Sequence, residues 1–128
     1  MPVNLVVSEV ATPPNRPYSQ AVTAGPIVAV SGQTPIGEDG LTVGVGDAEK
    51  QTECVLDRIE QLLNDAGAAM SDVIKVTVYL SDFEHFAAVN EVYRTRFPEP
   101  RPARTSVACS LVKPDYLVEI DALAVIDQ

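Results

Sequence analysis

The chain has 128 residues, of which 46% are hydrophobic and 21% are charged. This length and composition predict one globular domain over residues 1–128 and exclude a disordered chain. The 9 basic and 18 acidic residues give a net charge of −9 at pH 7, which argues against nucleic acid or an anionic membrane surface as the main partner. A small anionic ligand remains compatible with this charge, because one local arginine outweighs a diffuse negative field.

The chain also lacks the usual signals for secretion, membrane insertion and metal binding. The first ten residues have neither a basic start nor a long apolar run, and no stretch of about 18 apolar residues is present, so we expect a cytoplasmic protein. Cys54 and Cys109 lack CxxC spacing and a third ligand, and we interpret them as reduced thiols. His85, the single histidine, is expected to be exposed without a second ligand, so we predict no metal site.

The first third of the chain predicts three strands. Val3–Ser8 is a short β-rich run suited to an edge strand, and the proline-rich Ala11–Pro17 is a loop. Tyr18–Ala24 and Ile27–Gly32 follow as a pair of strands joined by a turn. The glycine-rich stretch that continues to Gly46 contains neither of the common phosphate-binding patterns, and we interpret it as a connection.

Apolar residues then recur at three- and four-residue steps, which predicts a helix from Asp47 to Ala66. Asp47 is a natural N-cap, and Gly67 stands where a left-handed residue commonly ends a helix. Val73–Leu80 is rich in β-branched residues, which favours a strand in the interior of the sheet.

A second helix is predicted over Phe83–Phe97, capped by Asp82 and ended by Pro98. Its apolar stripe also carries Asn90. An amide that faces a core needs hydrogen-bond partners, so Asn90 either pins neighbouring backbone or lies near a site. Structural pinning is the preferred interpretation.

Two further strands, Ala103–Leu111 and Leu117–Ile126, alternate apolar and polar residues. Alternate side chains of a strand point to opposite faces, so one surface of each strand can be buried while the other is polar. We predict that one such surface displays Arg104, Ser106, Glu119 and Asp121.

The order of three strands, helix, strand, helix and two strands predicts an α+β fold. In it, both helices pack on one face of a six-stranded mixed sheet. The face assigned to Arg104 and Glu119 stays uncovered, and apolar neighbours such as Ala29 and Leu123 make it a poor surface for water. We therefore expect self-association over this face, with a site where Arg104 and Glu119 meet the partner.

Four segments together resemble the Rid family, the reactive intermediate deaminases, also known as endoribonuclease L-PSP-like proteins. They are Pro17–Ala21 (PYSQA), Ser31–Pro35 (SGQTP), Arg101–Val107 (RPARTSV) and Val118–Ala124 (VEIDALA). The similarity extends over essentially the whole chain, and Asn90 and Tyr93 also fit. It implies a chorismate-mutase-like fold of the bacillus type, assembled as a homotrimer whose sheets form a central barrel, with sites in the clefts between subunits.

The resemblance also implies an enzyme that hydrolyses C–N bonds of 2-enamine and 2-imine acids, such as 2-iminopropanoate or 2-iminobutanoate, to 2-keto acids and ammonia without a cofactor. In such proteins the arginine matching Arg104 holds the substrate carboxylate, through a fork of donors that lysine cannot reproduce. The glutamate matching Glu119 positions the attacking water, and the tyrosine matching Tyr18 lines the pocket. Ser31 and Gly32 correspond to residues that contact the ligand.

Ser106 and Asn90 complete the predicted substrate-binding set, although Ser106 departs from the family pattern. The best-known deaminases of the family carry cysteine at this position, and Arg16 stands where many members have glycine. The cysteine is not a required nucleophile, so Ser106 is compatible with activity and can change substrate preference.

Other interpretations of these residues stay open. Arg104 can form an intersubunit salt bridge instead of binding a ligand, Glu119 can pair with a cation, and Tyr18 can pack at an interface. A non-catalytic, ligand-binding or chaperone-like trimer competes with the deaminase. A ribonuclease ranks third, because the net charge is −9 and no basic stripe with aromatic residues is present. The substrate stays open between a small imino acid and a catabolic enamine such as an aminoacrylate or aminomuconate.

Overall fold

The computed structural model describes residues 1–10, 12 and 15–126. It is built from eight strands and helices and two short 3-10 turns, Met70–Asp72 and Phe83–His85. The strands and helices are β1 (Asn4–Leu5), β2 (Ala21–Ala24), β3 (Ile27–Gln33), α1 (Ala48–Asp65), β4 (Val73–Leu80), α2 (Phe86–Arg96), β5 (Ala103–Ala108) and β6 (Val118–Val125).

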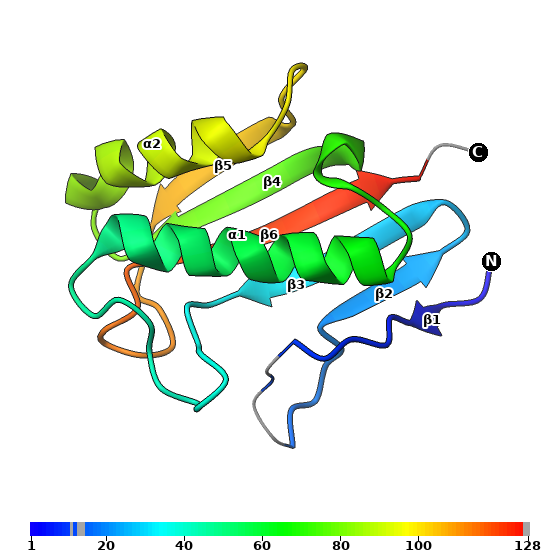
Figure 1. The fold of residues 1–128 in the computed structure, drawn as a ribbon, viewed down its shortest axis with the longest axis horizontal. Coiled ribbons are helices and arrows are strands. Elements are labelled where there is room, and N and C mark those ends of the chain that lie inside the picture. The colour runs from blue at the N-terminus through cyan, green and yellow to red at the C-terminus, as the bar shows by residue number, and fades with distance from the viewer. Residues whose placement is uncertain (11, 13–14, 127–128) are drawn as a thin grey trace.

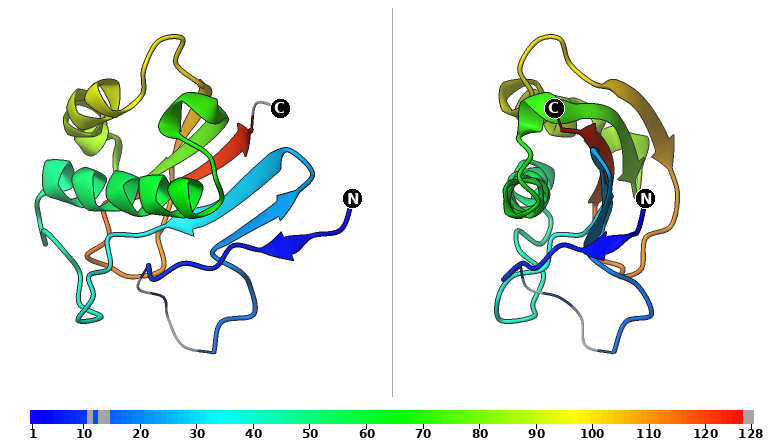
Figure 2. Two further views of the ribbon diagram at one scale, coloured as in Figure 1. Left: turned by 45° about the vertical axis from the view of Figure 1, so that its right-hand side comes forward. Right: turned by 90° about the vertical axis from the view of Figure 1, so that its right-hand side faces the viewer.

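The six strands form one sheet in the order β1-β2-β3-β6-β4-β5 (Figure 1). Every pairing is antiparallel except that of β4 with β5. Both helices lie on the same face of the sheet, and the other face carries no helix (Figure 2). The predicted α+β class, the mixed six-stranded sheet and the placement of both helices on one face are therefore confirmed.

The ends of α1 follow the predicted caps. The Asp47 carboxylate accepts a hydrogen bond from the Lys50 amide at 3.0 Å, which satisfies a donor that the first turn leaves without a partner. Gly67 adopts a φ of +85°, and the next amide, that of Ala68, donates back to the Leu63 carbonyl at 2.8 Å. Between these caps α1 buries an apolar stripe against the sheet: Val55, Leu56, Ile59, Leu62 and Leu63.

The region before α2 differs from the prediction. Asp82 acts as a cap, but its carboxylate accepts from the Glu84 amide at the start of a 3-10 turn, and the α-helix begins only at Phe86. His85 was expected to be exposed, and this is wrong, because it lies half-buried in the 3-10 turn Phe83–His85, with its imidazole 3.6 Å from the Glu84 carboxylate. Its side chain is 20% exposed.

An ion-pair cluster joins the two helices. Arg96 of α2 lies 2.9 Å from the Asp57 carboxylate, 3.1 Å from that of Glu60 and 3.8 Å from that of Glu53, all on α1. The Arg96 side chain is largely buried, so its guanidinium has lost much of its hydration. The three carboxylates compensate for this loss. The cluster therefore fixes α2 beside α1, over the edge of the sheet that ends in β5 (Figure 1).

Candidate functional site

The register of β5 determines the direction in which its polar side chains point. Arg104 lies opposite Val76, and Ser106 lies opposite Val78, in the parallel pairing with β4. Residues opposite each other in a sheet share a face, and Val76 and Val78 are buried under the helices. Arg104 and Ser106 therefore project from the helix-bearing face, and the alternate residues of β5 are exposed on the other face.

Glu119 and Asp121 project from the open face instead. In β6 they lie opposite Tyr79 and Thr77, and the Tyr79 hydroxyl donates to the Asp121 carboxylate at 3.0 Å. The prediction that one surface displays Arg104, Ser106, Glu119 and Asp121 is therefore wrong. The predicted alternation holds within each strand, but β5 is an edge strand with small or polar residues in both sets, so its sequence does not specify which set is covered.

Arg104 is held between aromatic rings at the edge of the sheet. Its guanidinium carbon lies 4.7 Å from the centroid of the Tyr93 ring and 5.6 Å from that of Phe86, both on α2. Such stacking orients a guanidinium without using its N–H donors. Among the residues that the structure describes, no carboxylate forms an ion pair with Arg104. The donors of Arg104 are thus available to an anion.

Asn90 lies on the same side of α2, between Phe86 and Tyr93 in the helical repeat. It is half-buried, and its side-chain amide forms no hydrogen bond within the described part of the chain. The predicted pinning of backbone by Asn90 is therefore wrong. We call Phe86, Asn90, Tyr93, Arg104 and Ser106 the arginine cluster.

Tyr93 contributes a buried polar atom to this cluster. The residue is 5% exposed, and its hydroxyl has no hydrogen-bond partner among the described residues. Burial raises the pKa of Tyr93, and the positive charges of Arg104 and Arg101 act in the opposite direction. The ring therefore contributes packing and cation–π contact, while the hydroxyl adds a desolvation cost.

Four of the other predicted site residues lie around a cavity of about 570 Å³ at the C-terminal end of β3. Tyr18, Ser31, Gly32 and Glu119 all line it, and we call it the glutamate pocket. A larger cavity of about 770 Å³ runs along α1 beside residues 7–10 and contains none of the predicted site residues. The glutamate pocket is thus the place where four predicted residues meet.

A β-bulge shapes the floor of the glutamate pocket. The pairing of β3 with β6 shifts register between Val30 and Gln33, so Ser31 and Gly32 fall outside the regular ladder. A Cβ atom added at Gly32 would collide with a carboxylate oxygen of Glu119. Gly32 therefore lets the Glu119 side chain lie directly across the strand. Burial raises the pKa of the Glu119 carboxyl, and the negative charge of Asp121 raises it further.

A buried hydrogen-bond network lies behind the bulge. The Gln33 amide nitrogen donates to the Gln20 side chain at 2.7 Å and to the Ser31 carbonyl at 3.0 Å. Arg58 of α1 donates to the Gln33 amide oxygen at 3.1 Å, and the Ser31 hydroxyl donates to the Ser19 carbonyl at 2.6 Å. All three long side chains are buried, so these bonds fix Ser31 and Gly32 from below.

The sequence predictions did not include Gln20, Gln33 and Arg58. Two features of the sequence could have identified them. Each glutamine belongs to a segment that carries the family resemblance, and Arg58 follows Val55 by three residues on the buried side of the predicted helix.

The structure separates the predicted site residues into two groups. Arg104 projects from one face of the sheet and Glu119 from the other, and β4 lies between their strands. Tyr18, Ser31 and Gly32 lie with Glu119, whereas Ser106 and Asn90 belong to the arginine cluster. The arginine cluster and the glutamate pocket of one chain therefore do not face each other, and we call them the two candidate half-sites.

Residues 8–126 match the family model described as endoribonuclease L-PSP. The chain belongs to this family. It is 44% identical over 124 residues to the 3-aminoacrylate deaminase RutC of Acinetobacter baylyi, which covers 97% of this chain and 98% of the relative. These comparisons, together with a structure named for the Rid family, confirm the family that the sequence segments predicted.

Two solved structures of the family superpose closely. A Rid family protein of unknown function from Yersinia pestis has 33% identity and a TM-score of 0.88, with 98% of this chain and all of that chain covered. TdcF of E. coli with bound serine has 31% identity and a TM-score of 0.87, with 97% and 99% covered. The fold of the L-PSP family therefore extends over nearly the whole of this chain.

Two classes of feature are absent from the described residues. No cluster of three or more histidine, cysteine, aspartate or glutamate side chains is arranged to hold a metal ion. Within the same residues, no helix combines the length and apolar character needed to cross a membrane.

Replacing Tyr93 by Phe is expected to raise the free energy of unfolding by about 1 kcal/mol, because a buried hydroxyl without a partner is costly. Tyr93→Leu is expected to lower it by about 2 kcal/mol, because the ring also packs against Phe97 with centroids 4.7 Å apart. Urea unfolding at one protein concentration measures both. A Tyr93→Phe variant less stable than the native chain by a similar amount would show that the hydroxyl has a partner.

The Glu119 carboxyl is expected to titrate above the ordinary range for glutamate. Its folded-state pKa is raised, so this group favours the folded state most at low pH, and that contribution is lost as the pH rises through the raised pKa. Asp121→Asn removes the neighbouring negative charge and is expected to lower the Glu119 pKa, while Asp65→Asn on α1 leaves it unchanged. Carboxyl-carbon NMR titration measures the pKa, and an unchanged value in Asp121→Asn would contradict this account.

Proposed function

We propose that this protein is a cofactor-independent hydrolytic deaminase that converts 2-imino and 2-enamino acids to 2-keto acids and ammonia. The observation that carries the proposal is the pair of complementary half-sites. One presents the donors of Arg104 without an ion-pair partner, and the other presents a carboxylate, Glu119, with a raised pKa. The relative named as a 3-aminoacrylate deaminase supports the same class of reaction.

The two half-sites are complementary only between copies of the chain, because they lie on opposite faces of one sheet. The open face also exposes apolar side chains that favour association: Ile27, Val107, Leu123 and Val125. We propose a homotrimer in which the open faces form a central barrel. In each cleft the arginine cluster of one copy meets the glutamate pocket of the next.

The chemistry needs few groups, because a protonated imine is already an electrophile. Arg104 would hold the substrate carboxylate through two charge-assisted hydrogen bonds and so fix the position of C2. Glu119 would accept a proton from water as the water oxygen bonds to C2. The raised pKa suits this role, because a general base works best when its pKa is near the operating pH.

The tetrahedral intermediate formed in this way carries a hydroxyl and an amino group on C2. The proton held by Glu119 passes to the nitrogen, and the ionised Glu119 then takes the proton of the C2 hydroxyl as the C–N bond breaks. The C2–O bond becomes a carbonyl, and the departing ammonia carries that proton away as ammonium, which leaves Glu119 ionised. Tyr18, Ser31 and Gly32 would line the side of the pocket where water enters. Ser106 and Asn90 would offer hydrogen bonds near the carboxylate, and Ser106 needs no nucleophilic role.

A binding-only or chaperone-like trimer is the second candidate, and Ser106 is the residue that favours it. It would bind carboxylates in the same clefts without turnover. Ribonuclease activity is not proposed, because the net charge is −9 and His85 belongs to neither half-site. We also propose a cytoplasmic location, where the free thiols of Cys54 and Cys109 stay reduced.

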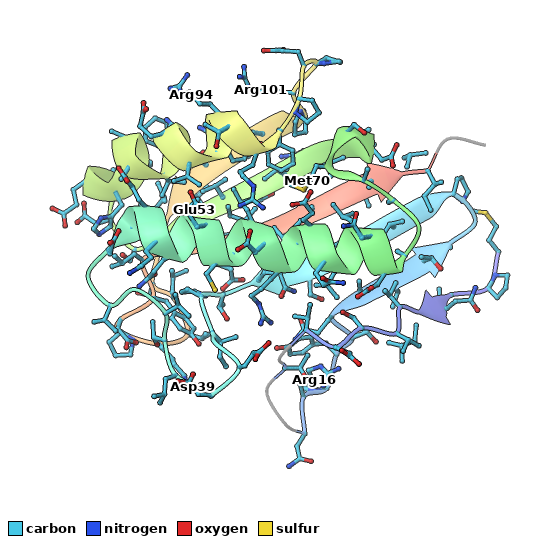
Figure 3. The ribbon with its side chains drawn as sticks, in the orientation of Figure 1. Arg16, Asp39, Glu53, Met70, Arg94 and Arg101 are labelled. Atoms are coloured by element: carbon cyan, nitrogen blue, oxygen red, sulfur yellow. The ribbon has the colours of Figure 1, made fainter. Side chains whose placement is uncertain are left out.

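The proposal is tested by generating 2-iminopropanoate and 2-iminobutanoate in situ with an amino-acid oxidase and trapping the surviving imine with semicarbazide. The native protein is expected to accelerate loss of the imine. Arg104→Ala is expected to lower kcat/KM by about 100-fold, because two charge-assisted hydrogen bonds are lost. The matched control is Arg94→Ala, since Arg94 points away from the sheet on the outer side of α2 (Figure 3).

No acceleration by the assembled native protein would reject deaminase activity on these substrates. Full activity in Arg104→Ala would reject the role of this arginine. Saturable binding of pyruvate without imine hydrolysis would instead support the binding-only candidate.

A further inference from the structure

Lys113 is a cation of the glutamate pocket to which the reaction proposed above gives no task. It lines the same cavity as Ser31, Gly32 and Glu119. Its ammonium nitrogen lies 5.7 Å from the centroid of the Tyr116 ring, and the Tyr116 ring is buried. No carboxylate among the described residues forms an ion pair with Lys113.

The turn that carries Lys113 is built into the core. The Tyr116 amide donates to the Lys113 carbonyl at 3.1 Å. Gln51 of α1, which is fully buried, donates to the Asp115 carbonyl at 2.8 Å and accepts from the Leu117 amide at 2.7 Å. These bonds hold the backbone on both sides of Tyr116. Lys113 therefore projects from a fixed base, and its ammonium group lies over an aromatic face.

The charge of the pocket is unusual for this chain. The protein carries a net charge of −9, yet the charged residues that line the pocket are Arg58, Lys113 and Glu119. Arg58 is buried and donates to Gln33 and to the Ile36 carbonyl, whereas Lys113 is exposed to the cavity. An exposed cation on a fixed turn favours an anionic ligand group here, because Glu119 is the single carboxylate among the described residues that line the pocket.

We infer that Lys113 recognises a second anionic group at the far end of the substrate, so that the preferred substrates are imino or enamino acids with two carboxylates. This inference rests on the proposed deaminase function. Arg104 of one copy would hold the carboxylate next to C2, and Lys113 of the next copy would hold the distal carboxylate. The cavity of about 570 Å³ is large enough for such an elongated acid.

The test compares 2-iminosuccinate, made from aspartate, with 2-iminopropanoate, made from alanine, each generated by an amino-acid oxidase and trapped with semicarbazide. The native protein is expected to prefer the dicarboxylate by about tenfold in kcat/KM. Lys113→Met is expected to remove this preference by raising KM for 2-iminosuccinate, with 2-iminopropanoate unchanged. Lys113→Arg is expected to keep it, because the positive charge remains.

Lys50→Met is the matched control, because Lys50 lines the larger cavity beside α1 and not the glutamate pocket. A native protein that hydrolyses 2-iminopropanoate, with equal kcat/KM for both imines and no effect of Lys113→Met, would overturn only the role of Lys113. A native protein that hydrolyses neither imine would overturn the proposed deaminase. In that case, calorimetry that compares the affinity of the protein for 2-oxoglutarate with its affinity for pyruvate decides the role of Lys113. Equal affinities for the two acids, both unchanged by Lys113→Met, would overturn the role of Lys113 as well.

Discussion

The parallel pairing of β5 with β4 puts Arg104 opposite Val76. This register decides on which face of the sheet Arg104 lies, and therefore whether it can meet the other candidate site residues within one chain. Val76 is buried beneath the helices, so the arginine must share its face and emerge beside α2. The antiparallel pairing of β6 with the same strand sends Glu119 to the opposite face. One sheet cannot present both residues to one small molecule within one chain, so the proposed site needs a second copy of the chain.

Each half-site is fixed by a different kind of interaction. Aromatic rings of α2 hold Arg104, and the ion pairs of Arg96 hold α2 against α1. On the other side, the bulge at Ser31 and Gly32 is supported from below by the buried amide of Gln33. Both supports depend on α1, because Arg96 pairs with its carboxylates and its Arg58 donates to Gln33. Packing of this helix therefore determines the geometry of both groups. Small substrates demand such rigidity, because misplacement by about 1 Å is costly for catalysis.

Much of this arrangement follows from local sequence. The caps at Asp47 and Gly67 were predictable because each depends on one residue type at one position. The direction of Arg104 was not, because an edge strand with small residues in both alternate sets carries no apolar face to orient it. The bulge before Gln33 is also invisible to simple alternation, since one extra residue reverses the faces after it. Long-range pairing supplied what these local patterns lack.

The central claim, that each site combines two copies of the chain, is tested most directly by complementation. Arg104→Ala and Glu119→Gln proteins, each inactive alone, are unfolded together, refolded as a 1:1 mixture and assayed for imine hydrolysis. If the half-sites meet across an interface, random assembly restores native sites in about a quarter of the clefts, and a corresponding fraction of the native rate returns. If both residues serve one site within a single chain, every site in the mixture keeps a defect. A mixture as inactive as its two components would therefore contradict the account.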